Sequence, residues 1–375
     1  MHDPISPRRR RRWIGWLATP AILLVAILAL QAWTLPEYAL TPGDARAVGP
    51  LVSIHGLAAA PPRHDILLTD VYLESLTAWQ WLVMHFQSHV QFVSSAELLD
   101  PGVPPSELGA QGYLEMYDSK QAAAVAGLRA LGWSVPARGT GAVITAVVGS
   151  SPAQRAGLAV GDEIVGVDGH RVASSCDLVR VIHNLPVGTR VRLRVAPVHI
   201  SAIGRLTWRP VRAITATSAR PGAPAVVGSC AGVTGAARSW LGLAVEDGVA
   251  YHLPGDVQVD TRSIGGPSAG LAMTLAIIDQ LSRHPITGHA IVAATGTIAP
   301  SGQVGDVGGV AEKTVAVQRA GATVFLVPTV EVATARAAAS PGLRVIGVRT
   351  LAQALAALAR LGGAVPQPLQ APSGS

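Results

Sequence analysis

A serine and a lysine in the last third of the chain are the residue types needed for a peptidase that uses no histidine. Ser268 lies in the glycine-rich segment Gly265–Gly270, and apolar residues recur at helical spacing after it. We expect a helix over Pro267–Leu281, because proline is favoured at the first helical position. Its free backbone N–H groups and the positive end of its dipole can stabilise an oxyanion beside the serine hydroxyl.

Lys313 is the base that such a serine needs. It lies at helical spacings from Val310 and Val317 and therefore shares an apolar face with them. Burial disfavours the charged form of lysine and lowers its pKa, so a neutral amine can take the serine proton. Two plainer interpretations remain open, Ser268 as a helix cap and Lys313 as a lysine whose ammonium reaches solvent. Glu312 falls on another face, and we expect it to be solvated.

Short motifs around these residues resemble, in order and spacing, the proteolytic domain of Lon-type proteases. The motifs are Gly266–Gly270, Thr295–Ile298, Gly302–Gly305, Val307–Gly309 and Glu312–Lys313. The resemblance covers roughly residues 240–360 and implies Ser268 as nucleophile and Lys313 as general base. The residues that would form the oxyanion site or line the active site are Gly265, Gly266, Ala269 and Thr297. Gly265 stands where typical Lon enzymes carry an acidic residue, which puts the local hydrogen bonding in doubt but not the dyad.

A second segment resembles the centre of a PDZ domain. In Ser151–Gly169 a short helix ends at Gly157, an alternating strand covers Glu163–Val167, and Asp168-Gly169 signals a hairpin turn. PDZ domains bind an extended peptide by adding it to a sheet edge beside a helix. The residues expected to line that groove are Gly141, Ala142, Val143, Ile144, Leu178 and Ile182. The plainer interpretation is a PDZ fold that only spaces the proteolytic domain from the membrane.

The N-terminus predicts a membrane anchor. Arginines at 8–12 precede 21 largely apolar residues, 13–33, and about 20 helical residues suffice to span a bilayer core. The basic block predicts a cytoplasmic N-terminus, with all later residues outside the cytoplasm. A cleaved signal peptide is the rival interpretation. It usually has a shorter core and a small-x-small cleavage site, and no Ala-x-Ala triplet occurs between Ala18 and Ala32.

These features predict an α+β fold with a transmembrane helix, a β-rich PDZ domain with two helices and a C-terminal Lon-type domain. The expected order is a cytoplasmic basic segment (1–12), a transmembrane helix (13–33), an extracytoplasmic juxtamembrane region (34–120), a PDZ domain (121–200), a connector (201–238), the proteolytic domain (239–361) and a disordered tail (362–375). Glu115–Lys120 also resembles the pre-PDZ segment of membrane-anchored PDZ–Lon-like proteases, which extends the resemblance over nearly the whole chain.

Several function classes are disfavoured. No Gly-x-x-x-x-Gly-Lys-Ser/Thr loop occurs, so we expect no ATPase in this chain. His85 and His89 lack the adjacent glutamate of a zinc-protease helix, and neither a metal nor a cofactor is expected. Interleaved aromatic and basic residues are absent, so nucleic acid is not an expected partner. Cys176 and Cys230 are expected as separate thiols, with a disulfide left open.

The sequence therefore predicts a membrane-anchored, ATP-independent serine endopeptidase that cleaves unfolded or membrane-proximal proteins and peptides. The PDZ domain would recruit substrate or regulate access. Two alternatives stay open, a catalytically silent PDZ scaffold and a precursor that mainly processes itself. The presence of both Ser268 and Lys313 argues against the scaffold. Lon-type domains often form rings, so the resemblance leaves a homo-oligomer open.

Overall fold

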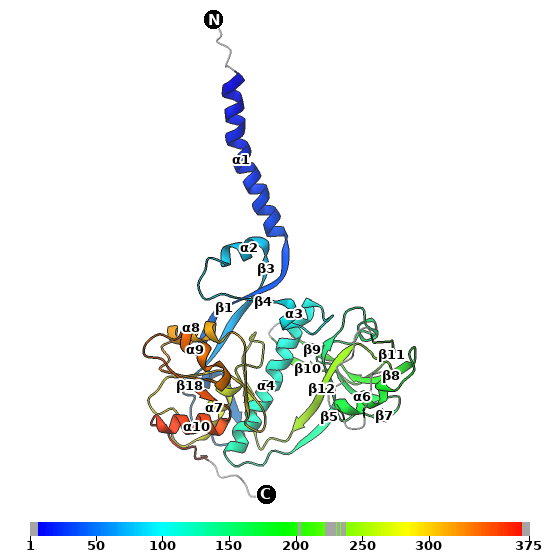
Figure 1. Ribbon diagram of the computed structural model, residues 1–375. Helices are drawn as coiled ribbons and strands as arrows, with labels where there is room; N and C mark the ends of the chain where they lie inside the picture. Colours follow the sequence, from blue (N-terminus) through cyan, green and yellow to red (C-terminus); the bar gives the residue numbers. More distant parts are fainter. Residues whose placement is uncertain (1–6, 202–203, 222–229, 231–232, 234–237, 370–375) are drawn as a thin grey trace.

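The computed structural model describes residues 7–201, 204–221, 230, 233 and 238–369. Two units lie side by side, and helix α1 projects away from them (Figure 1). The large unit is built around one six-stranded sheet and contains Ser268 and Lys313. The small unit is built around a second six-stranded sheet and contains Ser151–Gly169.

The sheet of the large unit has the strand order β18–β17–β14–β3–β1–β4. Its strands are β1 (Thr34–Ala47), β3 (Ile66–Thr77), β4 (Gln91–Ser94), β14 (Val292–Ala294), β17 (Val324–Pro328) and β18 (Arg344–Val348). The four strands from β18 to β3 run parallel, whereas β1 is antiparallel to both β3 and β4. Parallel strands are usually covered on both faces, and β14 and β17 accordingly read as continuous apolar runs.

Helices cover both faces of this sheet. One face packs against α4 (Leu108–Ala130), α7 (Gly270–Leu281) and α10 (Leu351–Arg360), and the strand residues that point to it include Leu68, Ala294 and Leu326. The other face packs against α8 (Val310–Arg319) and α9 (Val332–Ala338), and the alternate residues Leu67, Ala293 and Phe325 point there. The predicted arrangement, a sheet flanked by the Ser268 and Lys313 helices, is confirmed.

The N-terminal boundary predicted for the proteolytic domain needs correction. Residues 34–130 were assigned to a juxtamembrane region and the start of a PDZ domain, yet β1 and β3 lie inside the large sheet. Helix α4 packs along α7 and buries Ala123, Val125 and Leu128 in the same core. The large unit is therefore assembled from 34–130 and 256–361, with the small unit between them in the chain. Strands β3 and β14 pair although they are more than 200 residues apart in the chain, so no local sequence pattern shows that 34–130 belong to the large unit.

The small unit has the strand order β11–β8–β6–β5–β12, with β7 paired to β6. Its elements are β5 (Ala137–Val147), α5 (Pro152–Arg155), β6 (Glu163–Val167), β7 (His170–Arg171), α6 (Ser175–His183), β8 (Arg190–Ala196), β11 (Arg212–Thr217) and β12 (Leu243–Tyr251). Ile144, Ile164, Leu178 and Leu193 are buried in its core. The sheet thus continues past residue 200 through the predicted connector, which contributes β11.

The remaining elements are short. Paired strands are β2 (Val52–His55) with β13 (Asp256–Val259), β9 (Val198–Ile200) with β10 (Leu206–Trp208), and β15 (Thr297–Ile298) with β16 (Val304–Gly305). Short helices are α2 (Ala78–Met84), α3 (Ser95–Leu98) and the 3-10 turns Gly49–Leu51, Pro105–Glu107 and Thr329–Glu331.

Both ends of the chain depart from expectation. Helix α1 covers Pro7–Ala32, but no helix in the described part of the chain combines the length and apolarity needed to cross a bilayer. The transmembrane helix predicted over 13–33 is therefore not confirmed. The tail predicted to be disordered from 362 is ordered up to Leu369, whose N–H donates to the carbonyl of Leu281 at the end of α7. Residues 1–6 and 370–375 lie outside the described part.

Candidate active site

Ser268 lies in the turn directly before α7. The helix begins at Gly270, later than predicted, with Ala269 as its N-cap. The carbonyl of Ser268 accepts hydrogen bonds from the N–H of Gly296 at 2.9 Å and from Oγ1 of Thr295 at 3.2 Å. Both donors directly follow β14, so the end of this strand fixes the serine backbone.

The first backbone amides of α7 have no side-chain cap. The N-cap is an alanine, and among the described residues no acceptor takes a hydrogen bond from the N–H of Ser268 or Ala269. These N–H groups lie at the positive end of a 12-residue helix and can bind an oxyanion. Gly266 was also predicted to line this site, but its N–H donates to the carbonyl of Gly112 in α4 at 2.7 Å. Its own N–H is therefore not free for substrate.

Helix α4 contacts the loop that carries Ser268 from the side. Oγ of the buried Ser119 donates to the carbonyl of Pro267 at 3.0 Å. A Cβ on Gly265 would meet the backbone of Gly112 at 3.3 Å, and Gly266 adopts a φ of +81°. A side chain at 265 would thus need α4 to shift, which gives a physical reason for glycine where typical Lon enzymes carry an acidic residue.

Lys313 is buried in α8, with 2% of its surface exposed. Burial lowers the pKa of Lys313 to about 8, although the negative charges of Asp70, Glu331 and Glu312 act in the opposite direction. None of the described carboxylates lies within salt-bridge distance of its ammonium nitrogen. The lysine therefore exchanges its proton closer to neutral pH than an exposed lysine would.

The sheet register brings Ser268 and Lys313 to one end of the large unit. Thr295 and Gly296, which bind the Ser268 carbonyl, follow β14. Strand β3 runs parallel beside β14, and Asp70, whose charge acts on Lys313, lies just beyond the paired segment. The two residues approach this end from opposite faces of the sheet. No hydrogen bond among the described side chains joins Oγ of Ser268 to Nζ of Lys313, and catalytic hydrogen bonds often tighten only when substrate binds.

Two polar groups at this end are buried although the sequence does not predict it. Glu312, expected to be solvated, is only 4% exposed, and its Oε2 has no hydrogen-bond partner among the described residues. Thr69, beside the end of β14, is 1% exposed, and its Oγ1 is likewise unpaired within the described structure. Nothing local in the sequence marks either one, because burial here depends on strand pairing. Thr297, predicted to line the site, lies in β15 and is partly exposed.

The residues predicted to line the PDZ groove come together, but their groove is filled. Gly141–Ile144 lie in β5, while Leu178 and Ile182 lie in α6 and are buried. Strand β12 pairs along the whole of β5, so the edge expected to accept a peptide is taken by the chain itself. The groove is therefore not open in this structure.

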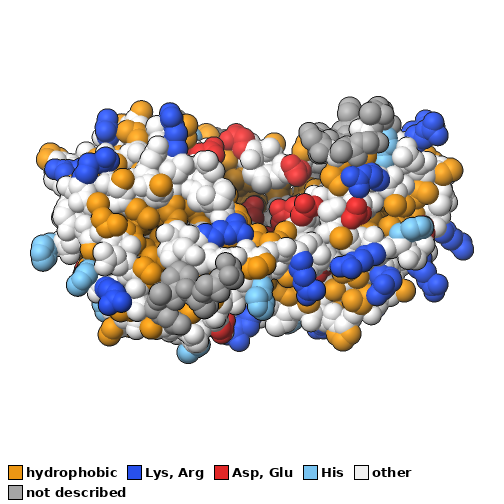
Figure 2. Space-filling model, turned by 90° about the horizontal axis from the view of Figure 1, so that it is seen from below, with side chains coloured by type: hydrophobic (Ala, Val, Ile, Leu, Met, Phe, Trp, Pro, Cys, Tyr) orange, Lys and Arg blue, Asp and Glu red, His pale blue; other side chains and the backbone are white. Residues whose placement is uncertain are grey.

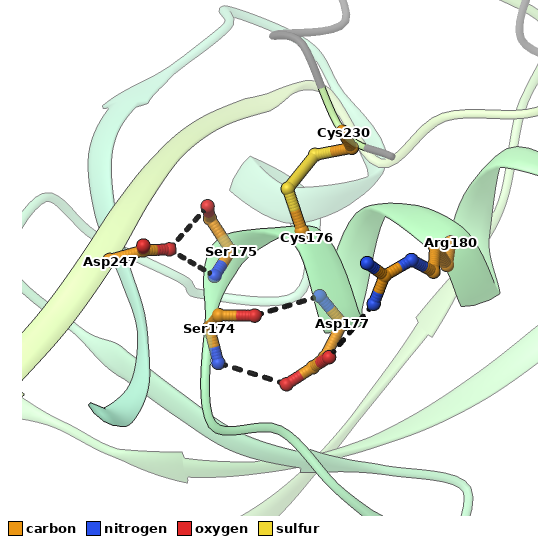
Figure 3. Close-up of a disulfide and its surroundings, with 7 residues drawn as sticks. All are labelled: Ser174, Ser175, Cys176, Asp177, Arg180, Cys230 and Asp247. Atoms are coloured by element: carbon orange, nitrogen blue, oxygen red, sulfur yellow. Dashed lines mark hydrogen bonds and ion pairs between the residues drawn. A yellow bond between two sulfur atoms is a disulfide. The ribbon is translucent and has the colours of Figure 1, made fainter. Parts of the chain in front are cut away.

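A disulfide and a carboxylate fasten the start of α6 (Figure 3). Cys176 and Cys230 are bonded, with their Cα atoms 5.4 Å apart, so the expectation of two separate thiols is wrong and the alternative left open is the one observed. On the other side, the N–H and Oγ of Ser175 donate to Oδ1 of Asp247 in β12, at 2.8 and 2.6 Å.

Comparisons with known proteins assign both units. The family model "PDZ domain" matches residues 129–196, and the model "Lon protease (S16) C-terminal proteolytic domain" matches residues 249–357. Lon protease of Clostridioides difficile is 49% identical over 63 residues, which are 17% of this chain and 8% of that protein. Lon protease of Frankia alni is 42% identical over 89 residues, 24% of this chain and 9% of that protein. The chain thus spans under a tenth of the length of these two relatives.

Among solved structures, the PDZ domain of an SdrC-like protein from Listeria monocytogenes is 18% identical and covers 28% of this chain and 87% of that chain, with a TM-score of 0.20. The segment that matches the Lon model lies in the large unit and contains both Ser268 and the buried Lys313. The chain therefore joins a segment that is similar to PDZ domains to one that is similar to the Lon C-terminal proteolytic domain. The two units are called the peptidase domain and the PDZ domain from here on.

Proposed function

We propose that this protein is a membrane-anchored, ATP-independent serine endopeptidase that cleaves unfolded or membrane-proximal protein chains outside the cytoplasm. The observation that carries the proposal is that Ser268, just before the uncapped start of α7, and the buried Lys313 lie at the same end of one sheet. A nucleophile, a base and free oxyanion donors are the parts that acyl transfer needs.

In the proposed reaction, neutral Lys313 accepts the proton of Ser268 as Oγ attacks the scissile carbonyl. The N–H groups of Ser268 and Ala269 bind the oxyanion that forms. Lys313 then gives its proton to the leaving amine, and the peptide bond breaks to leave an acyl-enzyme. Water attacks this ester, with Lys313 again as base, and the proton returns to Oγ as the acid product leaves.

The substrate class follows from what the chain lacks and what it carries. The sequence contains no phosphate-binding loop of its own, so unfolding by ATP hydrolysis is not expected from this chain. We propose that substrates reach Ser268 already unfolded or extended. The PDZ domain would regulate their access rather than simply space the peptidase domain from the membrane.

Two observations support the anchor and an extracytoplasmic location. Helix α1 projects away from both domains (Figure 1). Several of its apolar side chains are exposed, namely Ile22, Leu23, Leu24, Val25 and Leu28. The Cys176–Cys230 disulfide is typical of oxidising compartments. Digestion of intact spheroplasts with added protease tests this topology. Degradation of both domains would support it, and their protection would contradict it.

Cleavage of an unfolded model protein by the full chain in detergent micelles, without ATP, tests the activity. Wild type is compared with Ser268→Ala and Lys313→Ala, and with Ser263→Ala, an exposed serine in the same loop, as matched control. We expect wild type and Ser263→Ala to cleave and the other two to be inactive but folded. An inactive wild type, or activity that survives Ser268→Ala, would contradict the proposal.

A further inference from the structure

The PDZ sheet ends on a strand that is not part of the matched PDZ sequence. The family match stops at residue 196, whereas β12 begins at Leu243. It runs antiparallel to β5 from the pair Leu243–Val147 to the pair Tyr251–Ala137. Beyond Tyr251 the chain continues through β13 into the nucleophile loop. Strand β12 is therefore the direct connection between the PDZ domain and Ser268.

The position of β12 is that of a PDZ ligand. PDZ domains bind an extended peptide by adding it to a sheet edge beside a helix, and β12 lies along the edge strand β5 in contact with α6. Leu243 and Val245 of β12 pack on the core that contains Leu178 and Ile182, the residues expected to line the peptide groove. Backbone pairing and alternate side chains in a pocket are the two elements of this binding mode.

Asp247 adds a contact that is specific to the start of α6. Its carboxylate accepts two hydrogen bonds from Ser175, the first residue of the helix (Figure 3). The next residue, Cys176, is bonded to Cys230 in the segment that precedes β12. This covalent link keeps β12 near the groove and raises its effective concentration there.

The middle of the opposite side of β12 faces a cavity. A cavity of about 360 Å³ lies between β12 and α4, and Glu246, Asp247, Asp118 and Glu163 line part of it. Figure 2 shows acidic side chains gathered in the hollow between the two domains. Val249 of β12 is 41% exposed. On this side β12 packs, within the described structure, only through two residues near its ends, Ala244 against the cluster of Leu99 and Val103 and Tyr251 against the core of the peptidase domain. The strand between them can therefore leave its place without disrupting that core.

We propose that β12 is an intramolecular ligand of the PDZ domain, and that an extended peptide with an acidic residue facing Ser175 binds this domain by displacing β12. The partner is thus a protein segment in strand conformation that carries an Asp or Glu at the position of Asp247. In this arrangement the PDZ domain binds no external strand at β5 while β12 remains in place.

Displacement would also reach the peptidase site. Glu246 of β12 lines the cavity together with Asp118 of α4, where burial and the charge of Glu246 raise the pKa of Asp118 to about 8. The residue after Asp118, Ser119, holds the carbonyl of Pro267 beside Ser268. Removing β12 takes Glu246 away from Asp118, so we expect an external peptide to change the cleavage rate. This second step rests on the proposed peptidase function, whereas the binding step does not.

Binding is tested in the full chain with Ser268→Ala, so that no peptide is cleaved and the result does not depend on catalysis. The probe is a fluorescent nine-residue peptide with the sequence of 243–251, and its control has alanine at the position of Asp247. We expect the chain that also carries Asp247→Ala to bind the probe at least tenfold more tightly than the chain that retains Asp247, because its own strand is weakened. In that variant the control peptide should bind at least tenfold more weakly than the probe, and Ser175→Ala, which removes one of the two donors to this carboxylate, should reduce the preference.

Hydrogen exchange of the β12 amides provides a second readout that does not need Asp247→Ala to fold. In the chain with Cys176→Ser and Cys230→Ser, we expect saturating probe to increase exchange over 243–251. Absence of probe binding in both variants, with β12 amides equally protected with and without probe, would overturn the proposal and make β12 a permanent strand of the sheet. Cleavage by the wild type then tests the second step, and a rate unchanged by bound probe would overturn the coupling alone.

Discussion

The starts of α6 and α7 differ in how their backbone amides are satisfied. At α6, Ser174 and Asp177 form a capping box in which each side chain accepts from the backbone N–H of the other. Asp247 accepts from the next amide, that of Ser175. At α7 the N-cap is Ala269, whose methyl group cannot accept a hydrogen bond, although Ser268 lies next to it.

The capped amides at the start of α6 stabilise the fold, whereas the uncapped amides at the start of α7 remain available to bind a substrate oxyanion in the proposed reaction. A good N-cap stabilises a helix by about 1 kcal/mol, and α7 forgoes this contribution. Lys313 shows the same pattern, because its burial without an ion pair costs stability and, in the proposed reaction, provides the base. Changes at the α7 end should therefore alter cleavage, and changes at the α6 end should alter stability.

The largest effect is expected from Ser268→Ala. Loss of the nucleophile should reduce kcat by roughly 10³-fold or more. The free energy of unfolding should change by less than about 0.5 kcal/mol, since the side chain makes no hydrogen bond in the described structure. Steady-state cleavage and urea denaturation measure the two quantities. A similar loss of activity in Ser263→Ala would contradict a specific role for Ser268.

Lys313→Met should abolish cleavage and stabilise the fold. Below pH 8 the lysine is protonated in both states, so the folded state carries the full cost of burying its charge, about 3 kcal/mol. As pH rises from about 8 towards 10.5, the folded state loses this proton first, the cost shrinks, and wild type gains stability relative to the variant. Urea denaturation of both chains at several pH values measures the difference.

Lys120 offers the matched control, because the sequence contains no lysine besides it and Lys313. It is only partly buried, so Lys120→Met should change stability less. A stability gain that is equal for the two variants, or that is independent of pH, would contradict the buried-charge explanation.

Ser119→Ala should have an intermediate effect. The substitution removes the hydrogen bond to the Pro267 carbonyl and loosens the turn that positions Ser268. We expect kcat to fall about tenfold, which corresponds to about 1.4 kcal/mol, with little change in KM. The midpoint of the pH–rate profile should stay where it is in wild type, because Lys313 is untouched. A shifted midpoint would show that Ser119 acts on the base instead of on the turn.

The smallest effect on cleavage is expected from Ser174→Ala. Loss of the α6 cap should lower the free energy of unfolding by about 1 kcal/mol and leave kcat within about twofold of wild type. Thermal denaturation and cleavage assays on the same preparation check both. A large loss of activity here would remove the contrast between the two helix starts.

Local patterns predicted α7, which follows Ser268, and α8, which carries Lys313, because the apolar residues of both helices recur at the helical period. They did not predict that α4 and β3 belong to the peptidase domain, or that Glu312 is buried. These features depend on the pairing of β3 with β14, which are far apart in the chain. The pairing of β12 with the edge of β5 was not predicted for the same reason, since these two strands are also far apart in the chain.

The most direct test is the pH dependence of Ser268 modification by a fluorophosphonate, which requires no knowledge of the substrate. We expect peptide mapping to find the label on Ser268, and the rate of labelling to rise with pH through a midpoint of about 8, set by the pKa of Lys313. In Lys313→Met this rise should disappear. Labelling at another residue, or a rate on Ser268 that is independent of pH between roughly 6.5 and 9.5 in wild type, would contradict the Ser268–Lys313 dyad.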